Sequence, residues 1–145
     1  MWTIEPTDEY IRARKWYAKK RPRETSAVHD NLEAYIKSLN LGTNPLNAKF
    51  GFLHDERRGV FAVDQRTNNS PSDAKKLKLS QTRLYFYPEV ETGNIYLLTI
   101  GDKNSQQDDV RRCHEFVEDR RKELQDEGNR QKVREPERPS TPDGL

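Results

Sequence analysis

The segment RLYFYPEVETGNIYLLTIGDK, residues 83–103, constrains the fold of this chain more than any other stretch. Two apolar runs, over 84–87 and 95–100, flank a turn that contains Gly93, and this pattern predicts adjacent antiparallel strands. The segment stands out because the chain as a whole is polar, with a mean hydropathy of -1.14. Its ends are cationic, at Arg83 and Lys103. The sequence therefore predicts a central β-hairpin with a basic residue at its entry and another just after its exit.

The residues before the hairpin predict one strand followed by two helices. Alternation over 2–5 indicates a short strand, and a helix capped by Thr7 or Asp8 then runs to about Lys20, before Pro22. A second helix over 26–39 has its apolar residues at spacings of four, three and four. They are Val28, Leu32, Tyr35 and Leu39. Two helices joined by a short turn would lay their apolar stripes on the sheet that follows.

Two further elements complete the expected fold. The apolar run over 59–64 predicts another strand, and Ser105 is positioned to cap a last helix after the hairpin. The order is strand, helix, helix, three strands, helix. We expect an α+β fold with a small, antiparallel-rich, four-stranded sheet, two N-terminal helices on one face, and the other face partly open.

The length of 145 residues fits one domain, and the packed part is expected to be shorter than the chain. Apolar residues nearly vanish after Arg120. From Gly128 onward the chain mixes charges with three prolines, a composition that cannot bury enough surface to offset the entropy of ordering. We therefore expect a domain over 1–124 and a charged, proline-containing, disordered tail over 125–145.

Charge and cysteine content narrow the classes of function. The chain has 26 basic and 24 acidic residues, so a cationic site must be local. Its single cysteine, Cys113, permits no internal disulfide and is expected to be packed, and no apolar N-terminal run predicts a signal peptide or membrane span. The histidines have no companions at metal-ligand spacing. We expect a cytoplasmic protein with no metal, no cofactor and no membrane association.

Alternation along the first hairpin strand gives its side chains two faces. Leu84 and Phe86 fit the helix-covered face, which places Arg83, Tyr85 and Tyr87 on the open face. An arginine there can clamp a phosphate, and two tyrosines can stack on bases. The alternative is an edge cation beside half-buried tyrosines, and the pattern alone does not separate the two.

Other candidate residues lie on both sides of the hairpin. Lys75, Lys76 and Lys78 precede it. Lys76 and Lys78 would point to the same face of a strand, and two neighbouring ammonium groups lower the pKa of one of them, as a general base near neutral pH requires. A solvated lysine run is the alternative. Lys103 either lines an open site or pairs with a nearby aspartate. His54 is a further candidate acid or base.

The order of elements and the block KLKLSQTRLYFYPEVETGNIYLLTIGDKNSQQDDVRRCHEFV resemble the RelE/ParE superfamily of bacterial toxins, over most of residues 2–118. The stretches TRLYFY and LLTIGDKNSQQDDV are similar to the strand arginine, strand-end cation and final-helix start of RelE-like and HigB-like members. The resemblance implies the toxin of a type II toxin–antitoxin pair, with a cognate antitoxin as partner. It also implies a ribosome-dependent endoribonuclease that cleaves mRNA, inhibits translation and uses no cofactor.

Carried over by position, the resemblance implies roles for individual residues. Lys76 or Lys78 would be the base for the 2′-hydroxyl, Arg83 the phosphate clamp and Lys103 a second charge stabiliser. Tyr85, Tyr87 and Lys75 would contact RNA.

The sequence also departs from the family pattern. Asp109 stands where RelE-like enzymes often have a tyrosine, and this leaves the proton donor for the 5′-oxygen open among Tyr85, His54 and Asp109. ParE-like toxins, which inhibit gyrase without cutting RNA, share the fold. A non-catalytic binding protein is therefore the alternative.

Overall fold

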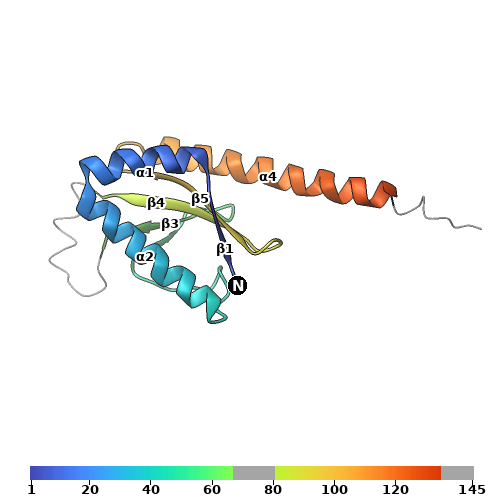
Figure 1. Ribbon diagram of the computed structural model, residues 1–145, viewed down its shortest axis with the longest axis horizontal. Helices are drawn as coiled ribbons and strands as arrows, with labels where there is room; N and C mark the ends of the chain where they lie inside the picture. Colours follow the sequence, from blue (N-terminus) through green and yellow to red (C-terminus); the bar gives the residue numbers. More distant parts are fainter. Residues whose placement is uncertain (67–80, 135–145) are drawn as a thin grey trace, which may run out of the picture.

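The structure is a computed structural model, and it describes residues 1–66 and 81–134 of the chain. Its elements carry the labels of Figure 1. In chain order they are β1 (Thr3–Pro6), α1 (Asp8–Lys20), α2 (Pro22–Asn40), β2 (Leu53–Asp55), β3 (Phe61–Asp64), β4 (Arg83–Glu89), β5 (Asn94–Gly101) and α4 (Gln106–Arg134).

The described strands form one five-stranded sheet in the order β1-β5-β4-β3-β2. β1 runs parallel to β5, and the other neighbouring pairs are antiparallel. The α+β class and the central hairpin are confirmed, with Gly93 in the turn at a φ of 74° that favours glycine. The expected number of four strands is wrong, because β2 adds a strand at the edge. With three residues, β2 is too short to produce a periodic signal.

α1 and α2 cover one face of the sheet and enclose the larger core. α1 begins as expected, with the Thr7 hydroxyl accepting a hydrogen bond from the Tyr10 N–H at 3.2 Å. α2 begins at Pro22, earlier than the expected start at 26, because proline suits the first helical position. The buried apolar residues of this layer include Tyr10, Val28, Leu32, Tyr35, Val63, Leu84, Phe86 and Ile100.

α4 packs on the opposite face, so the expectation of a partly open face is wrong. Cys113 and Val117 of α4 are buried against β3, β4 and β5. The apolar stripe of α4 is short, yet it suffices to close this side of the sheet. The second core contains Val60, Ala62, Tyr85, Tyr87, Leu98, Cys113 and Val117.

A buried ion pair fixes α4 to the hairpin. Glu89, at the end of β4, is fully buried and accepts from Arg120 through both oxygens, at 2.9 Å from Nη2 and 3.1 Å from Nε. The Thr92 hydroxyl donates to the same carboxylate at 2.6 Å, and the Arg120 guanidinium lies 5.1 Å from the centre of the Tyr96 ring. Because burying a carboxylate is costly unless it is paired, this contact ties the middle of α4 to the β4–β5 turn.

The second half of α4 extends beyond the sheet (Figure 1) and continues to Arg134. The boundary expected at 124 therefore falls inside a helix, because α4 also includes residues 125–134. Glutamine, glutamate, lysine and arginine are good helix formers, so a polar segment can continue a helix that packing has started. None of the helices in the described ranges combines the length and apolar character that a membrane crossing requires.

Candidate functional site

Polar side chains gather at one end of the sheet, where β3 ends, β4 begins and β5 ends. Asp64 pairs in register with Arg83, and Arg83 pairs with Gly101. Lys103 follows just after β5. The structure therefore brings the two cations of the hairpin to the same end of the sheet, as the sequence predicts.

A buried aspartate organises the outer part of this end. The Asp64 side chain is fully buried, and its Oδ2 lies 2.6 Å from His54 Nε2 and 2.7 Å from Arg66 Nε. Burial alone would raise the pKa of Asp64, but hydrogen bonds from His54 and from the Arg66 backbone, together with the charges of both partners, lower it overall. Asp64 is therefore an ionised anchor.

His54 is oriented by this carboxylate. An ionised carboxylate only accepts hydrogen bonds, so Nε2 of His54 carries the proton that faces Asp64 and Nδ1 is left with its lone pair in the neutral ring. The His54 side chain is 23% exposed, so molecules in solution can reach it. A histidine held by a buried aspartate is suited to proton transfer, because the carboxylate fixes the orientation of the ring.

Arg83 has a carboxylate partner in the structure. Its Nη1 lies 2.8 Å from Glu56 Oε1, and both side chains are mostly buried, at 14% and 11% exposed. His114 of α4 donates from Nε2 to the Glu56 carbonyl oxygen at 2.8 Å. The predicted phosphate clamp is therefore neutralised by an acidic neighbour that sequence reasoning missed.

Tyr85 and Tyr87 lie under α4 rather than on an open face. Tyr85 is fully buried and Tyr87 is 4% exposed, so neither can stack on a base while α4 is in place. The Tyr85 hydroxyl has no hydrogen-bond partner within the described part of the chain. Burial raises the pKa of Tyr85 strongly, Glu56 and Asp109 raise it further, and Arg83 lowers it.

Asp109 is also buried, at 6% exposed, and accepts a hydrogen bond from the Ser105 hydroxyl at 2.7 Å. Its carboxylate occupies the space where a side chain on Gly101 would begin. Burial raises the pKa of Asp109, although Ser105 and Arg112 act in the opposite direction. This residue packs the start of α4 onto the end of β5, and α4 shields it from a substrate.

Lys103 is exposed beside a shallow hollow of about 770 Å³ at the start of α4, which it lines with Asn104, Gln106, Gln107 and Val110. Among the side chains of residues 1–66 and 81–130, no ion pair involves Lys103. Of the two sequence-based alternatives, the open site fits Lys103 better than pairing with Asp102 or Asp109.

The three candidate lysines, Lys75, Lys76 and Lys78, lie outside the described residues. The residues that border this segment both contact the anchor: Arg66 as above, and Gln81 through its Nε2 at 3.4 Å from Asp64 Oδ2. The two described residues that flank the lysine-bearing segment therefore both lie at Asp64.

Sequence reasoning missed Asp64, Arg66 and Glu56. The run GVFAVDQR contains a usable signal, because a charged pair that ends an apolar strand must find partners. Which residues become the partners of Asp64 and Arg66 depends on the pairing of β2 with β3. Within the described ranges, no group of histidine, cysteine, aspartate and glutamate side chains is arranged to hold a metal ion.

Comparisons of the chain with protein-family models, with curated proteins and with solved structures find no match.

Proposed function

We propose that this protein is the toxin of a toxin–antitoxin pair and acts as a ribosome-dependent mRNA endoribonuclease of the RelE/ParE type. One observation carries the proposal: an accessible His54, held by the buried Asp64, lies at the same end of the sheet as Arg66, Arg83 and Lys103. A proton-transfer group beside several cations is what cleavage of a phosphodiester by its own 2′-hydroxyl requires. Ribosome, mRNA and a cognate antitoxin would be its partners, in the cytoplasm.

The proposed reaction divides the work among these groups. Lys76 or Lys78 takes the proton of the 2′-hydroxyl as its oxygen attacks the adjacent phosphorus. Arg83 and Lys103 stabilise the extra negative charge of the phosphorane-like transition state. His54, protonated and held by Asp64, donates a proton to the leaving 5′-oxygen, which yields a 2′,3′-cyclic phosphate and a free 5′-hydroxyl. Of the three candidate donors, His54 is the accessible one.

Binding of RNA at this site requires Arg83 to exchange its partner. A phosphate oxygen can replace the Glu56 carboxylate on the guanidinium, because both are anionic acceptors of similar hydrogen-bond geometry. When no substrate is present, the Glu56 carboxylate neutralises the charge of Arg83.

Induced expression followed by primer extension on a translated reporter mRNA tests the proposal. The wild type should arrest growth and cut the reporter within its reading frame. His54→Ala and the double variant Arg83→Ala/Lys103→Ala should reduce cutting by about 10²- to 10⁴-fold, the range for loss of a general acid or of transition-state charge stabilisation. Lys37→Ala, an exposed lysine on α2, is the matched control. Full cutting by the site variants would contradict the assignment.

A non-catalytic RelE/ParE-like protein, such as a gyrase-inhibiting toxin, is the second candidate. The pairing of Arg83 with Glu56 and the burial of Tyr85 and Tyr87 favour it, because these residues then serve the fold. This alternative predicts a DNA-damage response on induction with the reporter RNA intact.

A further inference from the structure

The outer face of α1 carries three cations around an exposed tryptophan. Arg12, Lys15, Trp16 and Lys19 follow one another at i, i+3, i+4 and i+7, a spacing that aligns them on one side of a helix. All four are exposed, and Trp16 is 51% exposed. No ion pair in the described ranges involves Arg12, Lys15 or Lys19. We call these four residues the α1 stripe.

The tryptophan of the stripe is held in place. Its ring packs edge-on against Tyr17, with 4.8 Å between centroids and 71° between planes, and Tyr17 is buried. An aromatic face that is both exposed and oriented can bind a flat partner at a low entropy cost. The stripe therefore combines uncompensated positive charge with a fixed stacking surface.

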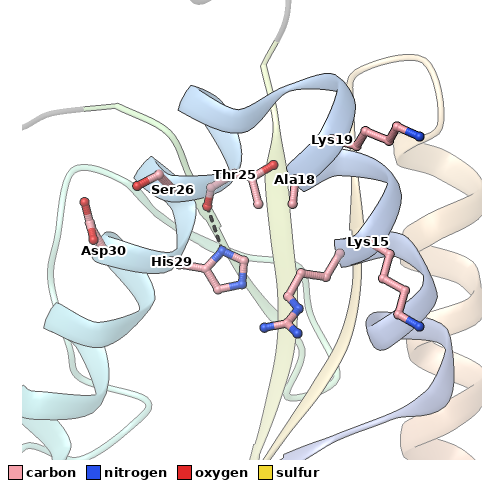
Figure 2. A pocket seen from close by; sticks show the side chains of 8 residues that line it. Lys15, Ala18, Lys19, Thr25, Ser26, His29 and Asp30 are labelled. Carbon is pink, nitrogen blue, oxygen red and sulfur yellow. Dashed lines mark hydrogen bonds between the residues drawn. The ribbon is translucent and has the colours of Figure 1, made fainter.

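An open cleft of about 610 Å³ lies beside the stripe, between α1 and α2 (Figure 2). Its lining residues are Arg14, Lys15, Ala18, Lys19, Thr25, Ser26, His29 and Asp30. Figure 2 shows the Lys15 and Lys19 side chains projecting from the side of α1 that faces away from His29. His29 itself is engaged through both ring nitrogens, at 2.6 Å from the Thr25 carbonyl oxygen and 2.6 Å from the Tyr10 hydroxyl. The cleft therefore has a rigid wall and a cationic rim.

The α2 side of the cleft is connected to the candidate site by hydrogen bonds. Asn31, next to Asp30, donates from Nδ2 to the carbonyl oxygens of Asp64 at 2.7 Å and of Arg66 at 3.0 Å. Figure 1 places the turn between α1 and α2 at the same end of the sheet as the beginning of β4. The α2 wall of the cleft is thus joined directly to the residues that hold His54.

We propose that the α1 stripe and the adjoining cleft bind single-stranded RNA, with phosphates on Arg12, Lys15 and Lys19 and one base stacked on Trp16. The inference rests on the proposed function, because it takes RNA as the ligand and supplies the surface for nucleotides that flank the cleaved one. Stacking on a side chain requires an unstacked base, so a single strand fits better than a duplex. A membrane surface fits worse, because a membrane-bound helix needs a broad apolar face and the apolar side of α1 is buried in the core.

Binding of a short, fluorescein-labelled 2′-O-methyl oligouridylate, which cannot be cut, tests the surface by anisotropy between about 50 and 200 mM salt. For Lys15→Gln/Lys19→Gln, the slope of log K against log salt should become shallower by about 1.4, which is 0.7 for each phosphate contact on a single strand. Trp16→Ala should weaken binding by roughly 5- to 150-fold, and Trp16→Phe should restore most of it. All substituted side chains are exposed, and thermal melting checks that each variant is folded.

The matched control is Lys37→Gln/Lys122→Gln, which removes the same charge from exposed positions on α2 and α4. Control and stripe variants that bind alike would overturn the proposal. So would stripe variants that bind RNA as the wild type does but lose binding to phosphatidylserine vesicles, because the stripe would then recognise a lipid surface.

The reporter-cleavage assay, run with the same variants, separates this inference from the nuclease proposal. Stripe-dependent RNA binding without any cleavage by the wild type would refute the nuclease and leave the surface standing. Cleavage by a wild type whose RNA binding does not depend on the stripe would refute the surface alone.

Discussion

The buried pair of Glu89 and Arg120 offers the sharpest test of how α4 is held. Replacing Arg120 with methionine keeps an unbranched apolar side chain and removes both hydrogen bonds to the Glu89 carboxylate, together with the contact to the exposed Glu123. Glu89 remains fully buried and keeps its hydrogen bond from Thr92. In the wild type, burial alone would raise the pKa of Glu89, but the hydrogen bonds from Arg120 and Thr92 and the charge of Arg120 lower it. The substitution leaves burial dominant and raises that pKa.

The resulting loss of stability can be bounded. Without Arg120, the buried Glu89 carboxylate can become neutral by binding a proton. Binding that proton costs about 1.36 kcal/mol for each unit by which the pH exceeds the ordinary pKa of about 4.3. This limits the charge-related loss to about 3.7 kcal/mol at pH 7 and to about 1 kcal/mol at pH 5. Arg120 is 21% exposed, so water offsets part of the loss. We expect Arg120→Met to lower the free energy of unfolding by about 2–3 kcal/mol at pH 7, near the lower end of values for broken buried pairs.

Urea unfolding of the wild type and of Arg120→Met, at pH 7 and at pH 5, measures the loss of unfolding free energy at each pH. The sign follows from linkage: the wild-type pair stabilises above the ordinary pKa of Glu89 and loses its contribution as the pH falls through the lowered pKa. The loss of stability in Arg120→Met grows as the pH rises above the ordinary pKa of a glutamate. Glu89→Gln/Arg120→Met is the control, and it should recover most of the loss because no charge is stranded. A loss below about 1 kcal/mol at pH 7, or one equal at both pH values, would refute the reasoning.

Three further predictions concern the end of the sheet. Gly101→Ala places a methyl group against the carboxylate of Asp109 and the hydroxyl of Ser105, and should cost about 1–3 kcal/mol in urea unfolding. Gly101→Ala/Asp109→Ala should recover part of that loss, and strictly additive effects would contradict the clash. Tyr85→Phe removes a buried hydroxyl without a partner, so the free energy of unfolding should stay the same or rise by about 1 kcal/mol, whereas a clear loss would show that the hydroxyl is satisfied. Asp64 has a lowered pKa, so its ion pairs stabilise the fold above its ordinary pKa and lose that effect as the pH falls through the lowered value. The loss of melting temperature caused by Asp64→Asn should therefore become smaller in acid. A loss that is the same at every pH would argue against ionisation of Asp64 as its source.

The sequence predicts elements whose signals are local. Alternation over 84–87 and 95–100 with Gly93 between them predicts the hairpin, and the spacing from Val28 to Leu39 predicts α2 within a few residues of its ends. Each signal lies within one continuous stretch of the chain, so neither depends on contacts with residues far away in the sequence. β2 has too few residues to show any period, and the continuation of α4 to Arg134 depends on helix propensity without packing.

The candidate site could be predicted only in part, for the same reason. Arg83 and Lys103 are marked by their places at the ends of the hairpin, and the structure keeps them at one end of the sheet. The contact of His54 with Asp64 requires β2 to pair with β3, so its signal lies in the register of two strands rather than in either one. Glu56 follows the unpredicted strand, and its neutralisation of Arg83 is equally invisible in the sequence.

Tyr85 and Tyr87 show what the covering helix means for access to RNA. Each aromatic side chain buries about 150–250 Å², and at about 25 cal/mol per Å² its exposure would cost up to about 4–6 kcal/mol. Exposing both tyrosines, with Cys113 and Val117 of α4, would consume most of the roughly 5–15 kcal/mol that stabilises a typical domain. Under the proposed function, RNA therefore approaches the end of the sheet, where His54 and Lys103 are already accessible, rather than the face under α4. The tyrosines then act through the core that aligns β4, and not through stacking on a base.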